Sequence, residues 1–247
     1  EQIEGTEQIG GASKELIAGY VAVGFDPRGV GSSAAIKCGD AASPFEWGLT
    51  PGQPQEGQSF EDWAQGYMGK ISELSKKCQE HSEPGLLDHV NTVSVARDLD
   101  VLRAVSGEKT LNYLGMSYGT ELGYTYAELF PANTGRLVLD GAVDPSLSAE
   151  DMSLGQAKGF EASLRAYVES CQSSKLGCPL SGDVASGVSQ VREFLETTKT
   201  APVPTSDSKR PLTYDLAVYG VLGSMYQTQA WPSLTLGLSQ AMGKEGK

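Results

Sequence analysis

Gly115-x-Ser117-x-Gly119 is the segment whose residue types and spacing point most clearly to chemistry, because it stands between a predicted strand and a predicted helix. A serine on such a turn has a strained backbone, and small residues two places to either side let the strand and helix approach closely. Its hydroxyl then lies over the carboxyl ends of the strands, where open α/β sheets bind ligands. We predict that Ser117 is a nucleophile and that the backbone N–H of Tyr118 stabilises an oxyanion. The plainer alternative is a chance pattern in a glycine-rich chain, with Ser117 only capping a helix.

A serine nucleophile needs a base, and the positions of the histidines in the chain limit which residue can be that base. His81 and His89 both precede Ser117, and no histidine follows it. Three explanations stay open at this point. The chain is a fragment or a piece of a processed enzyme, His89 acts as base from the start of a predicted helix, or the protein binds peptides or partners without catalysis.

The elements that must position the serine alternate between apolar runs and helical patterns. Tyr20–Phe25 and Arg136–Asp140 are predicted as strands buried on both faces, with a further strand at Thr110–Leu114. Helices are predicted at about 60–78 and at 120–129. Another is predicted between a cap at Asn91 or Thr92 and a stop at Gly107, with the apolar positions Val95, Leu99, Leu102 and Val105 at helical spacing. Right-handed crossovers join such elements into a parallel sheet flanked by helices, so the predicted class is α/β.

The pattern changes after Asp144-Pro145. Helical stretches are predicted at 154–171, 184–198 and 214–226, without a convincing buried strand. We expect residues 1–145 to form a sheet domain and residues 146–247 to form an inserted helical cap.

The amino-acid composition limits the classes of partner that the chain is expected to bind. With 19 Lys plus Arg against 31 Asp plus Glu, the net charge is −12, which repels phosphate backbones and makes nucleic acid a poor partner. No apolar run approaches the roughly 18 residues that a membrane span requires. The chain opens without a basic and then apolar leader, so we expect a mature or trimmed form.

The four cysteines favour an exported protein. Their spacing suggests the pairs Cys38–Cys78 and Cys171–Cys178, while four reduced thiols remain an alternative. A metal site would need closer Cys spacing or neighbouring histidines, so no metal is expected. The expected location is secreted or associated with the cell envelope.

Several ordered motifs resemble the α/β-hydrolases of the actinobacterial tripeptidyl aminopeptidase type, relatives of prolyl iminopeptidase. They are Gly24–Ser33, Asp98–Arg103, Asn112–Gly123, Tyr126–Pro131 and Arg136–Gly141. The resemblance implies an α/β-hydrolase fold and an exported serine exopeptidase. Such an enzyme releases short peptides from substrate N-termini through an acyl-enzyme on Ser117, with Tyr118 as oxyanion donor. It also implies the Cys171–Cys178 disulfide, a peptide substrate and no cofactor.

The chain departs from that family pattern at two places. The family's Gly-Gly-Pro-Gly type loop, which supplies a second oxyanion donor, is represented in residues 1–19 only by Gly10-Gly11. The family also places its acid and histidine after the cap. The remaining C-terminal part of the same enzyme is therefore an expected partner.

Secondary candidates have supporting roles. Asp26 and Arg28 are expected to orient each other by a bidentate pair near the turn, and Glu121 either packs beneath the site or binds a substrate amine. The acidic and charged positions Asp98, Asp100 and Arg103 are expected to form a solvated or strand-bracing face. Further candidates are Asp140 and Asp144 as triad acid, and Glu161, Glu169, Glu193 and Glu196 as partners of a substrate ammonium. A serine esterase or lipase would use the same turn.

Overall fold

The computed structural model describes residues 18–39, 54, 57–174 and 177–243. The chain forms two compact units, and in the sequence the first gives way to the second between Pro145 and Ser146. Each unit is described on its own.

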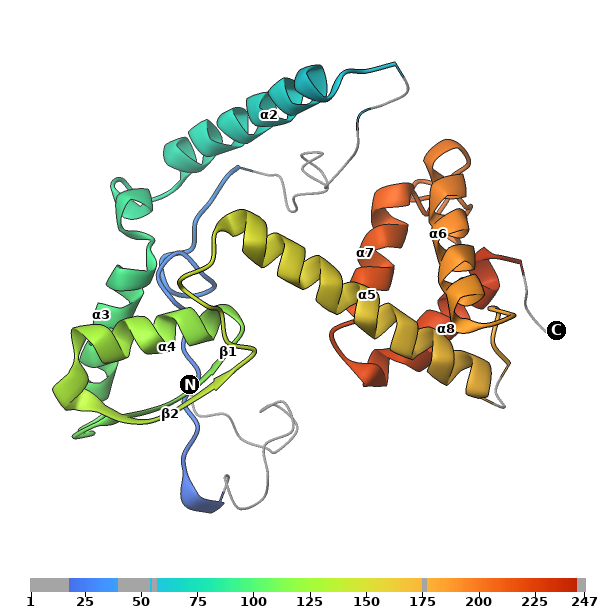
Figure 1. The fold of residues 1–247 in the computed structure, drawn as a ribbon. Coiled ribbons are helices and arrows are strands. Elements are labelled where there is room, and N and C mark those ends of the chain that lie inside the picture. The colour runs from blue at the N-terminus through green and yellow to red at the C-terminus, as the bar shows by residue number, and fades with distance from the viewer. Residues whose placement is uncertain (1–17, 40–53, 55–56, 175–176, 244–247) are drawn as a thin grey trace. The chain divides into compact units, whose positions relative to one another are not determined.

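The first unit joins helices to a small parallel sheet (Figure 1). Its elements are α2 (Phe60–His81), the 3-10 helix η1 (Leu86–His89), α3 (Thr92–Val105), β1 (Leu111–Met116), α4 (Tyr118–Leu129), the 3-10 helix η2 (Pro131–Asn133) and β2 (Thr134–Asp140). β1 and β2 pair in parallel, with Leu114 beside Val138 and Gly115 beside Leu139. A parallel pair with an intervening helix confirms the predicted α/β class.

Local capping explains where the helices begin and end. The Asn91 side chain accepts a hydrogen bond from the Ser94 N–H at the start of α3, and Ser59 accepts one from the Asp62 N–H at the start of α2. Gly107 has a φ of 77°, a left-handed conformation that suits the end of α3. Of the two predicted caps, Asn91 is the one that the structure uses, and the helix ends before Gly107 as predicted, since both ends are coded locally.

The core of the first unit lies between α3 and α4. Val95, Ala96 and Leu99 of α3 are buried with Leu122 and Tyr126 of α4. These five residues are each at most 4% exposed, so they supply the apolar burial that fixes the two helices against each other.

The prediction of two strands buried on both faces is wrong in the part of the chain that the structure describes. In β2, Leu137 and Leu139 are half-buried, whereas Val138 is 58% exposed. Tyr20–Phe25 forms no strand: Val23 makes only an isolated bridge and Val21 is 71% exposed. An apolar run becomes a buried strand only where neighbouring strands and helices on both faces enclose it.

The second unit is helical. Its elements are α5 (Ala149–Ser173), α6 (Val184–Thr200), α7 (Tyr214–Ser224), the 3-10 helix η3 (Thr228–Ala230) and α8 (Trp231–Ala241). Tyr167, Val168 and Val191 are fully buried at its centre. The sequence predicted the first three helices but not α8. Among the described residues, none of the helices combines the length and the apolar character of a membrane span.

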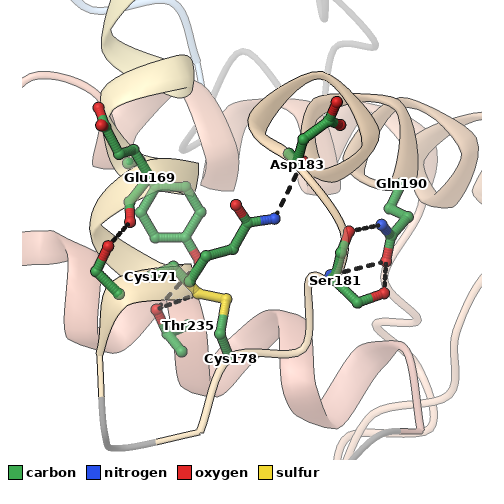
Figure 2. Close-up of a disulfide and its surroundings, with 10 residues drawn as sticks. Glu169, Cys171, Cys178, Ser181, Asp183, Gln190 and Thr235 are labelled. Atoms are coloured by element: carbon green, nitrogen blue, oxygen red, sulfur yellow. Dashed lines mark hydrogen bonds between the residues drawn. A yellow bond between two sulfur atoms is a disulfide. The ribbon is translucent and has the colours of Figure 1, made fainter.

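A disulfide closes a loop in each unit. Cys38 is bonded to Cys78 of α2 in the first unit, and Cys171 of α5 to Cys178 in the second. Figure 2 shows the second bond, with the Thr235 hydroxyl 3.9 Å from the Cys171 sulfur. Both pairs are the ones that the spacing suggested.

Candidate active site

Ser117 occupies a strained turn between β1 and α4. Its φ and ψ are 52° and −120°, and the only other described non-glycine residue with positive φ is Ala34. Such a conformation costs about 1–3 kcal/mol and persists only where the surroundings impose it. The Ser117 N–H donates to the Asp140 carbonyl over 2.9 Å, so the end of β2 helps to hold the turn.

Two small residues make this turn possible. A Cβ on Gly115 would lie 2.6 Å from the Gly119 carbonyl carbon and from Tyr113 Cε1, and one on Gly123 would lie 2.6 Å from Leu139 Cδ2. The Tyr113 hydroxyl donates to the Gly119 carbonyl over 2.8 Å. Strand and helix therefore approach as closely as a nucleophile elbow requires.

The Ser117 hydroxyl is not used to hold the helix. Ser117 is the N-cap residue of α4, yet its side chain makes no capping hydrogen bond, and the residue is exposed. The interpretation of Ser117 as a simple cap is therefore wrong. A strained, exposed and uncommitted hydroxyl is the arrangement expected of a nucleophile.

Tyr118 is the first residue of α4, so its backbone N–H lacks an acceptor within the helix and points out of the helix N-terminus. Thr120 stabilises the turn through two hydrogen bonds. Its hydroxyl donates to the Ser117 carbonyl over 2.7 Å and accepts from the Val143 N–H over 3.0 Å. An amide at this position and the partial positive charge of the helix end can stabilise a developing oxyanion.

The Tyr118 side chain is tied to the start of α3. Its hydroxyl lies 2.9 Å from Thr92 Oγ1, and Thr92 donates to Glu121 Oε1 over 3.3 Å. Glu121 and Asp144 also act on Tyr124, whose pKa is raised first by burial and then by these two negative charges. The structure thus brings Glu121 together with Tyr118, two of the predicted site residues.

Arg28 has a different partner from the expected one. It forms a bidentate pair with Asp98 of α3, with 2.7 Å from Nε to Oδ2 and 2.6 Å from Nη2 to Oδ1. This hydrogen bonding raises the pKa of Arg28 above its usual value. The Asp26 carboxylate instead accepts from the Ser32 N–H over 2.9 Å. The predicted Asp26–Arg28 pair is wrong, because the fold places the guanidinium against the carboxylate of Asp98, 70 residues away in sequence.

Asp100 and Arg103 brace the far end of the same helices. Asp100 Oδ1 accepts from Arg103, from the Tyr126 hydroxyl over 3.0 Å and from Asn133 Nδ2 over 2.9 Å. The hydrogen bond from Arg103 lowers the pKa of the Asp100 carboxyl most. Sequence reasoning missed Tyr126 and Asn133, because their partner belongs to another helix and no local pattern marks it.

The structure shows no hydrogen bond between either histidine and Ser117 among the described residues. His89 ends η1, where its backbone carbonyl accepts from Arg28 over 3.4 Å, rather than beginning α3 as predicted. His89 lines a cavity of about 680 Å³ with Arg28 and Asp98, and Ser117 is not among the described residues lining it. His81 Nδ1 lies 2.8 Å from the Lys77 carbonyl on α2. The region of Gly10-Gly11 lies outside the described residues.

Comparison with known proteins agrees with this geometry. The alpha/beta hydrolase fold family matches residues 10–232. The chain is 37% identical over 232 residues to "Serine protease Hip1" of Mycobacterium tuberculosis, covering 91% of this chain and 44% of that protein. It is 48% identical over 128 residues to "Tripeptidyl aminopeptidase" of Streptomyces lividans, covering 51% and 23%. It is 35% identical over 228 residues to "Carboxylesterase B" of Mycobacterium tuberculosis, covering 92% and 43%. The chain therefore spans less than half of the length of these relatives.

Proposed function

The chain belongs to the α/β-hydrolase fold family, and we propose that it carries the nucleophile of an exported serine exopeptidase that releases short peptides from substrate N-termini. The observation that carries the proposal is the Ser117 hydroxyl, which is exposed on a strained elbow and makes no capping bond. In this proposal the first unit is the sheet domain and the second is the helical cap that shapes substrate choice.

The proposed reaction has two steps. Ser117 Oγ attacks the scissile carbonyl carbon and gives its proton to a base, while the Tyr118 N–H donates to the oxyanion. Collapse of this intermediate breaks the C–N bond, and the base protonates the leaving amine. Water then attacks the acyl-enzyme, so that the short peptide leaves with a free carboxylate and Ser117 regains its proton.

We place the base and its orienting acid in the longer protein, outside these 247 residues. The ring contact of His81 with the Lys77 carbonyl supports this choice over a role for His81. The place of His89 at the end of η1, on a cavity whose described lining does not include Ser117, supports it over a role for His89. In this proposal the partner of the chain is the remaining part of the same enzyme. The disulfides favour an oxidising location, either secreted or in the cell envelope.

Two carboxylates of the second unit are our candidates for binding a substrate ammonium. Glu161 and Glu196 already pair with Arg165 and Lys199 over 2.7 Å each. We therefore favour Glu169 and Glu193, which are exposed on α5 and α6. Neutralising either one should raise KM for peptides with free N-termini.

The likeness to "Carboxylesterase B" supports a second candidate function, hydrolysis of esters by the same serine. Ester and amide substrates undergo the same acyl transfer, so the elbow accommodates both.

Peptide digestion by the full-length gene product tests the proposal. We expect release of short N-terminal peptides from an unblocked substrate and no cleavage of its N-acetylated form, because the free ammonium is part of recognition. Ser117→Ala should abolish both peptide and ester hydrolysis. Hydrolysis of esters without peptide cleavage would favour the esterase, and peptide cleavage retained in Ser117→Ala would overturn the proposal.

A further inference from the structure

Helices α3 and α4 are joined by hydrogen bonds at both ends. At the end near the elbow, Thr92 contacts the Tyr118 hydroxyl at 2.9 Å and Glu121 at 3.3 Å. At the other end, Asp100 accepts from the Tyr126 hydroxyl at 3.0 Å. The two helices cross in Figure 1, and Val95, Ala96 and Leu99 of α3 are buried with Leu122 and Tyr126 of α4. We call the Thr92–Tyr118–Glu121 contacts the elbow clamp and the Asp100–Tyr126 contact the distal clamp. Only the elbow clamp includes a residue adjacent to Ser117.

The donor and the acceptor of each hydrogen bond in the elbow clamp can be assigned. A carboxylate only accepts, so the single Thr92 hydroxyl proton is directed to Glu121. The Tyr118 hydroxyl must then donate its proton to Thr92 Oγ1. This Tyr118-to-Thr92-to-Glu121 chain ends on a negative charge, and a charged acceptor strengthens the bonds that lead to it.

The elbow clamp holds the Tyr118 side chain, which few packing contacts restrain. Tyr118 is 51% exposed, so burial contributes little to its order. Its backbone N–H is the proposed oxyanion donor, and its side chain is held at the far end by Thr92. Oxyanion stabilisation depends on donors that are already oriented before charge develops.

We propose that Thr92 and Glu121 are positioning residues that orient the Tyr118 amide for transition-state binding. This inference rests on the proposed function and assigns it two residues without contact to the reacting atoms. Their effect should appear in turnover and in the affinity of a transition-state analogue, with the ground-state affinity for substrate unchanged.

Thr92→Val in the full-length gene product tests this inference, because valine keeps the shape and removes the hydroxyl. We expect kcat to fall about tenfold with KM changed less than about twofold, and a peptide boronic acid to bind weaker by the same factor as kcat. Thr92→Ser should restore the rate. Tyr118→Phe should act like Thr92→Val, and the double variant should lose no more than either alone, because all three remove the same bond.

Tyr126→Phe is the matched control, since it breaks the distal clamp of the same helix pair. It should lower the melting temperature and leave kcat within about twofold of wild type, because Tyr126 is remote from the elbow. A Thr92→Val enzyme with wild-type kcat, or a Tyr126→Phe enzyme with the same loss in kcat, would overturn the inference. If wild type itself neither turns over nor labels at Ser117, the proposed function fails, and this inference falls with it.

Discussion

Ser117 differs from an ordinary N-cap residue in both backbone and side chain. N-caps have extended backbones and use their oxygen to accept an N–H of the first turn, as Asn91 does for Ser94. Ser117 has positive φ and leaves that role unfilled, with the Thr120 hydroxyl bracing its carbonyl instead. The strain is thus maintained by neighbouring contacts, and the Ser117 side chain makes no capping hydrogen bond.

Replacing Gly115 tests whether the close approach of β1 and α4 is needed for the turn at Ser117. Gly115→Ala should destabilise the protein by about 1–3 kcal/mol in urea unfolding, because its Cβ would clash with backbone at Gly119. The control is Gly66→Ala on the helix α2, where no described atom lies within 4 Å of the added Cβ. That change should stabilise by up to about 1 kcal/mol. Equal effects of the two substitutions would contradict the packing argument.

At the scale of elements, the α3–α4 pair carries the site. α3 holds Arg28 through Asp98 and holds Tyr118 through Thr92, so one helix contacts both the 26–33 turn and the elbow. Buried apolar contacts between the helices and the Asp100 cluster at the far end keep this helix in place. These distant contacts therefore stabilise the helix pair, whereas the contact with Tyr118 is made by Thr92 at the elbow end.

Acid should loosen this pair through Asp100. Its folded pKa is lowered, chiefly by the hydrogen bond from Arg103, so it contributes stability above its unfolded pKa and loses it as pH falls through the folded value. Asp100→Asn should therefore be less stable than wild type at pH 7, and the gap should narrow below about pH 4. Urea unfolding at both pH values measures this. Asn133→Ala removes only one hydrogen bond to the Asp100 carboxylate. The stability difference between wild type and Asn133→Ala should therefore change less with pH than the difference between wild type and Asp100→Asn. Parallel curves for wild type and Asp100→Asn would contradict the assignment.

Elements coded by local chemistry could be predicted from the sequence, whereas those that need distant neighbours could not. The Asn91 cap and Gly107 stop give the bounds of α3, and the glycines around Ser117 identify the elbow. The run from Tyr20 to Phe25 resembles a buried strand, but burial depends on the elements around it. The partner of Arg28 depends on tertiary packing, because its acceptor is 70 residues away. α8 was missed although Pro232 lies in its first turn, where proline favours a helix start, because the interior Gly237 weakens its helical pattern.

At the scale of the whole molecule, each of the two units has its own core and its own disulfide. Cys38–Cys78 closes a 40-residue separation in the first unit, and Cys171–Cys178 a 7-residue separation in the second. A cross-link restricts the unfolded chain more when the loop it closes is longer. The two bonds should therefore differ in their contribution to stability.

Replacing each cysteine pair by serine measures this difference. The Cys38→Ser/Cys78→Ser variant should lose about 4 kcal/mol and the Cys171→Ser/Cys178→Ser variant about 2 kcal/mol of unfolding free energy. Hydrogen exchange should locate the first loss in α2 and the second in α5 and α6. A larger loss from the shorter loop would contradict the loop-entropy explanation.

The most direct test of the account is active-site labelling of the full-length gene product with a fluorophosphonate, followed by mass spectrometry of the peptides. We expect one adduct on Ser117, which is lost in Ser117→Ala and retained in Ser106→Ala, a serine at the end of α3. A folded protein that gains no adduct at Ser117, or that labels equally when Ser117 is alanine, would contradict the claim that this serine is the nucleophile.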